Sequence, residues 1–294
     1  MNRTPGPDFI CVGAPKAGTR WLYDQLQYHP DFWMPPIKEF RYLDHPYPKM
    51  KNAVQFVQLA ARSPDRVRRR LAKRGAREWT SQDLEFLREA SALDGERMDI
   101  LRYNSLFRFK GELLSGDISP GYSGLDDEVV KQVAEHIPQT KIVFLVRDPV
   151  ARVWSGISML YRHGKFDADI LSDPRRFREE LERRTGMKNR SAPTEVVERW
   201  TRCAPAIPFR YFLFDEIESD PEESRRKILL YLGADPGKAS GELPANHNRK
   251  AKAEKLPLAE PIKAVLVDYF KDEMRACAKV FGGHAQAWLT RYGL

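Results

Sequence analysis

The chain has 294 residues, of which 42% are hydrophobic, 31% charged and 11% aromatic. This composition is that of a folded protein with a sizeable core, and it excludes a disordered or fibrous chain. The formal net charge of +8 predicts attraction to phosphorylated or other anionic ligands without selecting one class of partner.

Strand-like and helix-like segments alternate along most of the chain. Apolar segments rich in β-branched and aromatic residues predict strands at residues 9–13, 113–118, 141–146 and 209–214. Helical periodicity and capping residues predict helices at residues 19–28, 126–137, 148–161 and 221–232. This alternation predicts an α/β fold, in which a central, mostly parallel sheet carries helices on both faces.

Two regions break the alternation, residues 47–107 and 174–202. Both contain helical signals only, including the capping pattern T-S-Q-D that begins at Thr80. Neither region has enough apolar residues for a core of its own, so we expect helical insertions beside the site, within a single domain of residues 1–294. A last amphipathic pattern over residues 257–281, followed by two glycines, predicts a final helix.

The segment GAPKAGTRWL, residues 13–22, lies between the first predicted strand and the first predicted helix. Backbone N–H groups and the positive end of a helix can bind one phosphate at such a position, and glycine permits the close approach. A Walker A loop has lysine where this chain has Thr19, so the pattern predicts a P-loop-like phosphate-binding loop of another type. An ordinary turn with a solvated Lys16 is the alternative.

A second anion-binding segment is predicted at VFLVRDPVARVWSG, residues 143–156. Arg147 follows a buried strand, at the edge where open α/β sheets bind ligands, and Ser155 lies about two helical turns further on. A guanidinium and a hydroxyl suit a second phosphate, with Arg152 sharing that task or pairing with Asp148. The alternative is a helix capped by Asp148 with solvated arginines, and the presence of two such segments in one chain disfavours it.

Taken together, PKAGTRWL, HPDFWMPPIKEFRYLD, GDISPGY and FLVRDPVARVWSG resemble the sulfotransferase family that uses 3′-phosphoadenosine 5′-phosphosulfate. The resemblance is greatest to its heparan-sulfate-type and bacterial carbohydrate branches, and it runs in family order from residue 9 to about residue 255. It implies a loop around the 5′-phosphosulfate of the donor. The loop residues are Lys16, Ala17, Gly18, Thr19 and Arg20.

The resemblance further implies that Arg147 and Ser155 hold the 3′-phosphate of the donor. The segment KAKAEKLP is similar to a donor-covering loop of the family, and Lys252 falls on the lysine of that loop. Two residues depart from the pattern here, because Ala253 and Glu254 stand where the family has glycine and arginine.

A general base at Glu39 is also implied, because this residue occupies the glutamate of the family's E-x-H-F-F-like segment. An acceptor hydroxyl must lose its proton as it attacks sulfur, and a carboxylate within hydrogen-bond reach accepts that proton. Lys16 is expected to stabilise the charge on the leaving nucleotide. This chain has Arg41 in place of a frequent histidine, Asp117 in place of a frequent glutamate, and Ile118 in place of a lysine.

The sequence thus predicts sulfuryl transfer to a hydroxyl or amine of a carbohydrate or small-molecule acceptor, with release of adenosine 3′,5′-bisphosphate. A nucleotide-dependent P-loop kinase is one alternative, disfavoured by the missing GK[ST] sequence. A non-catalytic polyanion-binding module is another, and it would use the basic run from Arg66 to Arg77, a pattern more typical of a solvated helix face. For Glu39 the alternative is a surface ion pair with Lys38 or Arg41.

No metal, nucleic-acid partner or membrane span is expected. The six histidines form no HxxxH or HExxH pair, and the three cysteines are far apart in the sequence. No stretch approaches the roughly 18 consecutive apolar residues of a membrane span, and the first residues lack the layout of a secretion signal. We therefore expect a cytoplasmic protein. No motif identifies the acceptor, the sulfated position or the oligomeric state.

Overall fold

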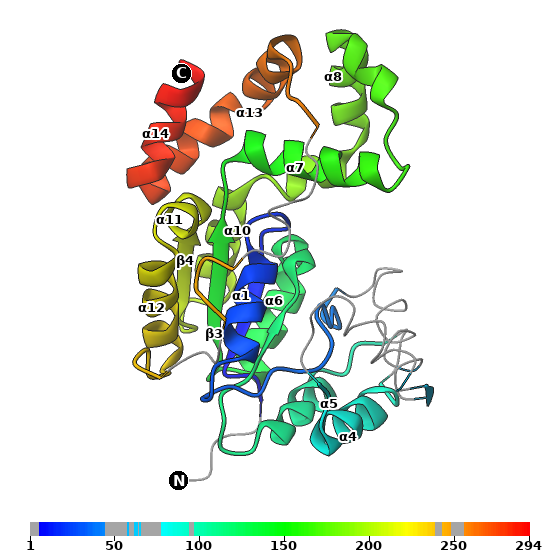
Figure 1. Ribbon diagram of the computed structural model, residues 1–294, viewed down its shortest axis with the longest axis vertical. Coiled ribbons are helices and arrows are strands. Elements are labelled where there is room, and N and C mark those ends of the chain that lie inside the picture. Colours follow the sequence, from blue (N-terminus) through cyan, green and yellow to red (C-terminus); the bar gives the residue numbers. More distant parts are fainter. Residues whose placement is uncertain are drawn as a thin grey trace.

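The computed structural model describes residues 6–44, 58, 62–63, 65, 78–93, 97–238, 243–247 and 256–294. At its centre four parallel strands form one sheet in the order β2-β1-β3-β4 (Figure 1). They are β1 (Phe9–Gly13), β2 (Gly116–Ile118), β3 (Lys141–Val146) and β4 (Phe209–Leu213). β1 is buried throughout and β3 at all but its first residue, so both faces of the central strands are covered. The predicted α/β class is confirmed.

The described helices flank the sheet and extend beyond it. In Figure 1, α1 lies in front of the strands, while α8, α13 and α14 lie beyond α7. Helix α12 contacts α1 through Arg225 and Gln25, and α6 packs against α10. Their bounds are α1 (Thr19–Gln27), α4 (Ser81–Ala90), α5 (Ile100–Ser105), α6 (Asp127–His136), α7 (Pro149–Arg162), α8 (Pro174–Arg183), α9 (Thr185–Asn189), α10 (Pro193–Cys203), α11 (Phe214–Ser219), α12 (Pro221–Leu232), α13 (Glu260–Phe281) and α14 (Gly283–Tyr292). Short 3-10 turns occur at Leu106–Lys110, Pro120–Gly124 and Ala168–Ser172.

Several helices begin and end where the sequence predicts. The side chain of Asp126 accepts a hydrogen bond from the backbone of α6, and Asp148 accepts two from the first turn of α7, which starts with proline. Thr80 and Asp83 form the predicted capping box at the start of α4. Helix α12 ends at Gly233, whose φ of 88° is the left-handed conformation that glycine adopts without strain.

Two predicted strands are shorter than expected. The strand predicted for residues 113–118 begins only at Gly116, because Leu114 first pairs with the segment after α1: its N–H donates to Asp31 and its carbonyl accepts from Trp33. The strand predicted for residues 209–214 stops one residue early, and Phe214 begins α11.

The prediction of one final helix was wrong, because α14 follows α13. Gly282 ends α13 at the predicted place, but the chain turns there and continues as a second helix. Trp288 of α14 belongs to the core around the sheet, whereas Leu289 and Tyr292 pack against a second cluster formed by α7, α8 and α13. Helix α14 therefore bridges the two apolar clusters of the fold.

The described residues of the regions predicted as insertions contain helices and no strand. Helices α4 and α5 lie within residues 47–107, α8 and α9 lie within residues 174–202, and α10 begins in the latter region and ends at Cys203. That these regions belong to a single domain and flank an acceptor site stays a prediction. None of the described helices is both long enough and apolar enough to cross a membrane.

Candidate functional site

The carboxyl ends of β1 and β3 are neighbours in the sheet, and each leads into a predicted anion-binding segment. Two hydrogen bonds join these segments. The Ala14 N–H donates to the Leu145 carbonyl at 2.7 Å, and Nη1 of Arg147 donates to the Lys16 carbonyl at 2.7 Å. In open parallel sheets ligands bind at this edge, between strands whose connections diverge. The fold thus brings the loop after β1 and the arginine after β3 into direct contact.

The loop after β1 presents the N-terminus of α1. No described side chain caps this helix and its first turn has no acidic residue. Its first N–H groups can therefore serve as donors to an anion. Gly18 precedes the helix with a φ of 93°, and a Cβ there would lie 3.0 Å from a ring carbon of Phe214. Both the backbone conformation and the close approach of the ring require glycine at this position.

Arg147 is held at the edge of the loop by two contacts. Besides its hydrogen bond to Lys16, its guanidinium lies over the Phe214 ring, 4.5 Å from the centroid. Burial lowers the pKa of Arg147, and the nearby carboxylates of Glu218 and Asp148 oppose that shift. No other hydrogen bond to its guanidinium occurs in the described part of the chain, so further N–H donors remain for an anion.

The other residues predicted to bind the nucleotide have no observed contact with Arg147 among the residues that the structure describes. Ser155 lies half-buried on α7, and no hydrogen bond among the described residues connects it to Arg147. Lys252 and the basic run from Arg66 to Arg77 fall outside the described residues.

Residues before and at the end of the predicted donor-covering loop contact the two helices that begin at the site. Trp21 of α1 donates to the Ala245 carbonyl at 2.6 Å, and Trp154 of α7 donates to the Leu256 carbonyl at 2.9 Å. Ala245 precedes the loop match and Leu256 is its next-to-last residue, so both ends of this segment are anchored, one to α1 and one to α7.

Lys38 links its neighbour Glu39 to the loop after β1. The ammonium of Lys38 is 3.4 Å from the Thr19 hydroxyl of that loop and 3.6 Å from Oε1 of Glu39. The Lys38 side chain is only 5% exposed, whereas that of Glu39 is 39% exposed. Burial lowers the pKa of Lys38. One buried ammonium therefore contacts both the loop hydroxyl and the carboxylate predicted to be the base.

Asp117 anchors the segment that carries Glu39. This carboxylate is buried and accepts hydrogen bonds from Tyr103 at 3.0 Å, Tyr122 at 2.6 Å and Ser119 at 2.7 Å. Burial raises its pKa, and these hydroxyl donors oppose the shift. Ser119 in turn accepts from the Arg41 N–H at 2.9 Å. Through Ser119, Asp117 is therefore linked to the backbone of the segment that carries Glu39.

Arg41 pairs with a carboxylate within its own loop. Its guanidinium pairs with Asp44, and a Cβ on Gly121 would clash with both side chains. The replacement of a frequent histidine by Arg41 therefore stabilises the loop that follows Glu39.

Two arginines add positive charge near the site without an ion pair among the described residues. Arg152 is 4% exposed, its Nε has no hydrogen-bond partner, and one terminal nitrogen donates to the Met187 carbonyl at 3.3 Å. Burial and then repulsion from Arg190 and Arg147 lower the pKa of Arg152 to about 9. Arg190 follows α9. Burial and then repulsion from Arg41 lower its pKa, and the carboxylates of Asp44 and Glu39 oppose the shift.

Sequence reasoning missed three contributors to this arrangement. Lys38 was considered only as a surface partner of Glu39, although burial makes it part of the site. Phe214 was assigned to a strand, and Arg190 carried no pattern at all. Lys38 is adjacent to a predicted base, which is a usable signal; the roles of the other two depend on tertiary contacts alone.

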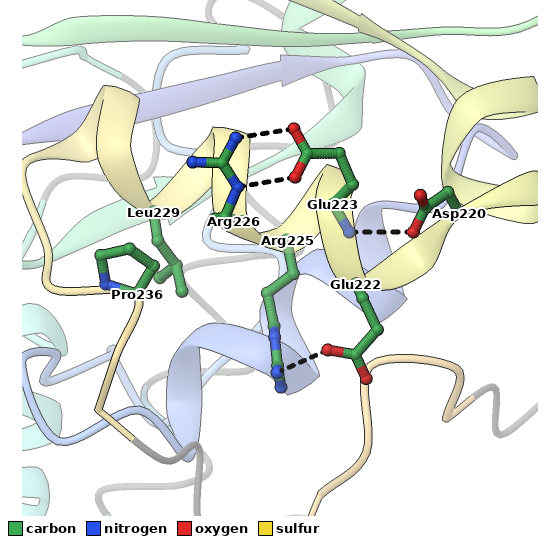
Figure 2. A pocket seen from close by; sticks show the side chains of 7 residues that line it. All are labelled: Asp220, Glu222, Glu223, Arg225, Arg226, Leu229 and Pro236. Carbon is green, nitrogen blue, oxygen red and sulfur yellow. Dashed lines mark hydrogen bonds and ion pairs between the residues drawn. The ribbon is translucent and has the colours of Figure 1, made fainter.

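A surface hollow along α12 lacks the features of a site (Figure 2). Its charged side chains pair with each other along the helix, Arg225 with Glu222 at 3.2 Å and Arg226 with Glu223 at 2.6 Å. Exposed ion pairs of this kind on one helix face neutralise each other's charge and contribute little to the free energy of unfolding. Within the described ranges no three His, Cys, Asp or Glu side chains gather as metal ligands.

Comparison with known proteins identifies the same family as the motifs. A family model described as "Sulfotransferase family" matches residues 7–236. Among solved structures, a sulfotransferase from Alicyclobacillus acidocaldarius is similar with a TM-score of 0.63 at 20% identity, covering 96% of this chain and 98% of that one. The sulfotransferase domain of the Synechococcus PCC 7002 olefin synthase has a TM-score of 0.51 at 16% identity, covering 92% and 96%. No curated protein matches significantly.

Proposed function

The chain belongs to the sulfotransferase family, and from this premise we propose that it uses 3′-phosphoadenosine 5′-phosphosulfate to sulfate a hydroxyl or amine. The acceptor proposed is a carbohydrate or a small molecule. The observation that carries the proposal is the hydrogen bond between Arg147 and the Lys16 carbonyl, which joins two anion-binding segments at neighbouring strand ends. A donor with phosphate groups at both ends of its ribose needs two such segments side by side.

The donor is proposed to lie with its 5′-phosphosulfate on the loop of Lys16, Gly18 and Thr19. The uncapped N-terminus of α1 supports this orientation, because its N–H groups favour an anion. Arg147 is proposed to bind the 3′-phosphate, with Ser155 and Lys252 completing the donor site. Adenosine 3′,5′-bisphosphate is then the product that leaves.

In the proposed reaction the acceptor oxygen or nitrogen attacks sulfur, and the bond from sulfur to the bridging oxygen of the 5′-phosphate breaks. The acceptor proton passes to the Glu39 carboxylate, and the electron pair of the broken bond stays on the nucleotide. Lys16 and the loop N–H groups stabilise the charge that develops there. Lys38 lies buried between Thr19 and Glu39, and we propose that it stabilises the sulfuryl oxygens during transfer.

The acceptor is proposed to lie between the segment of Glu39 and the turn after α9. Arg190 in that turn is near enough to Glu39 for the two charges to interact. We keep the proposal at carbohydrate or small molecule, with residues 47–107 and 174–202 proposed to shape the acceptor cleft.

Thermal melting tests the donor site. Adenosine 3′,5′-bisphosphate at about 100 times its dissociation constant should add roughly 2.7 kcal/mol to the stability of the fold by mass action. AMP at the same concentration should add much less, because it lacks the phosphate that Arg147 is proposed to bind. Equal stabilisation by both nucleotides would contradict a 3′-phosphate site.

A further inference from the structure

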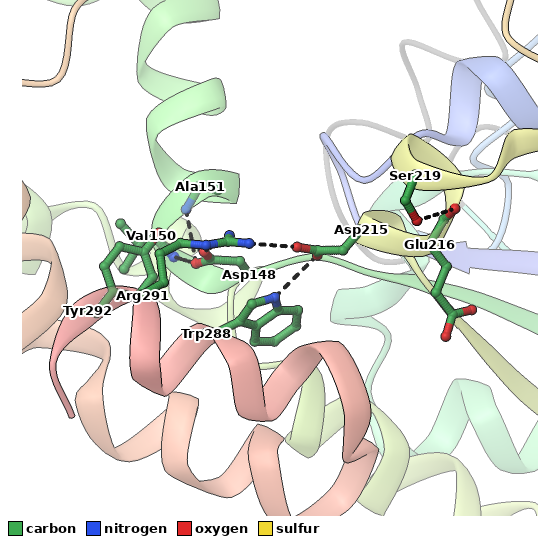
Figure 3. Close-up of polar contacts among 9 residues, drawn as sticks. All are labelled: Asp148, Val150, Ala151, Asp215, Glu216, Ser219, Trp288, Arg291 and Tyr292. Carbon is green, nitrogen blue, oxygen red and sulfur yellow. Dashed lines mark hydrogen bonds and ion pairs between the residues drawn. The ribbon is translucent and has the colours of Figure 1, made fainter.

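Helix α14 holds two carboxylates at the donor side of the site (Figure 3). The hydroxyl of Tyr292 donates to Oδ2 of Asp148 at 2.6 Å, and Arg291 donates to the same oxygen at 3.2 Å. Arg291 also donates to Oδ1 of Asp215 at 3.1 Å, while Nε1 of Trp288 donates to Oδ2 of Asp215 at 3.2 Å. We call Trp288, Arg291 and Tyr292 the latch.

Both carboxylates are sequence neighbours of groups that position Arg147. Asp148 follows Arg147 directly, and Asp215 follows Phe214, whose ring supports the guanidinium at 4.5 Å. One side chain, Arg291, spans the two carboxylates and so ties the backbone that carries the guanidinium to the segment that carries the ring beneath it. One helix thus fixes Arg147, the residue proposed to bind the 3′-phosphate, from two directions.

The contact at Asp148 leaves that residue little freedom. Its side chain is 1% exposed, and its second oxygen, Oδ1, accepts the N–H groups of Val150 at 2.8 Å and Ala151 at 3.2 Å. Burial raises the pKa of Asp148, and the hydrogen bond from Tyr292 is the foremost of the contacts that oppose the shift. Because all four donors converge on one buried carboxylate, the start of α7 and the direction of Arg147 are set together.

We propose that Arg291 and Tyr292 are positioning residues that orient Arg147 for the 3′-phosphate of the donor. The inference rests on the proposed function, because that proposal assigns the 3′-phosphate to Arg147. In this proposal the latch residues act through Asp148 and Asp215 rather than on the nucleotide. Their effect is to hold the guanidinium in its binding orientation before the nucleotide arrives, so that less conformational entropy is lost on binding.

This role has a signature that a purely structural role lacks. Weakening the latch should reduce affinity for nucleotides that carry a 3′-phosphate and leave the affinity for AMP nearly unchanged. The informative quantity is therefore the ratio of the AMP dissociation constant to that of adenosine 3′,5′-bisphosphate. A general loss of fold stability moves both constants together and leaves the ratio as it was.

The experiment is titration calorimetry of the full chain with these two nucleotides. Tyr292→Phe removes one donor to Asp148 with little change in shape. Arg291→Gln removes the charged links to both Asp148 and Asp215 at a side chain that is 48% exposed, so this variant should fold. We expect each to lower the ratio about five- to tenfold, the scale of one weakened charge-assisted contact. Melting temperatures are recorded for every variant.

Tyr231→Phe is the matched control. The Tyr231 hydroxyl donates to the carbonyls of Ile142 at 3.1 Å and Pro208 at 2.8 Å, at the opposite ends of β3 and β4 from Arg147. It removes a similar hydroxyl without touching the latch, so it should keep the wild-type ratio.

Three outcomes are separable. A ratio that falls in both latch variants and holds in Tyr231→Phe supports the inference. A large wild-type ratio that survives both latch variants overturns it while leaving the proposed donor site intact. A wild-type ratio near one refutes the 3′-phosphate site at Arg147, and the positioning role fails with it.

Discussion

Tyr122→Phe should loosen the segment that carries the proposed base. The Tyr122 hydroxyl is fully buried, donates to Oδ2 of Asp117 at 2.6 Å and accepts the Leu43 N–H at 3.2 Å. Removing it deletes a hydrogen bond to a carboxylate and leaves a buried N–H without this acceptor. Each of these losses costs about 1–3 kcal/mol, so we expect a total of about 2–6 kcal/mol in the free energy of unfolding.

Urea unfolding measures this cost directly. Tyr161→Phe is the control, because Tyr161 lies on α7 with its side chain 45% exposed, and it should change stability by less than about 0.5 kcal/mol. The same Tyr122→Phe protein should bind adenosine 3′,5′-bisphosphate normally but transfer sulfate more slowly, since Leu43 and Glu39 share one loop. A stability loss within the range of the control would refute the view that the Asp117 network holds this loop.

The proposed roles make three further predictions. Glu39→Gln should bind donor normally and lower the single-turnover rate by roughly 100- to 10,000-fold, and a rate above about a tenth of wild type would remove Glu39 as the base. Arg147→Ala should weaken donor binding most, whereas Lys16→Ala should lower the single-turnover rate at saturating donor; equal rate losses would contradict this division. Burial lowers the pKa of Lys38, so its ammonium should lose its proton, and the enzyme its activity, at a lower pH than an exposed lysine would. In Lys38→Arg the side chain stays charged, so the fall in rate at alkaline pH should move to higher pH in a pH–rate profile. An unchanged alkaline limb would exclude Lys38 from the reaction.

The sheet and its adjoining helices were predictable because local signals there agree with the tertiary fold. The run KIVFLV is apolar at nearly every position, which is what a strand buried on both faces requires, and the caps at Thr80, Asp126 and Asp148 mark helix starts within one residue. Helix α14 was missed because two consecutive glycines normally end helical structure. Here they form a turn between two helices.

The charged residues proposed for the donor site could be named from the sequence, but the contacts that position them could not. Motif order pointed to Lys16 and Arg147, and the fold brings them into contact through neighbouring strands. The ring of Phe214 beneath the guanidinium and the Arg291 contacts come from segments more than 60 residues away, so no local pattern marks them. The ligand role of Ser155 stays a prediction, and so does that of Lys252.

The most direct test of the account is transfer of labelled sulfur. The full chain is incubated with 3′-phosphoadenosine 5′-phosphosulfate carrying radioactive sulfur, pooled carbohydrates and small molecules, and EDTA. We predict label on an acceptor together with an equal amount of adenosine 3′,5′-bisphosphate, and loss of both in Glu39→Gln. Nucleotide release without labelled acceptor, or group transfer that needs ATP and Mg²⁺ instead, would contradict it.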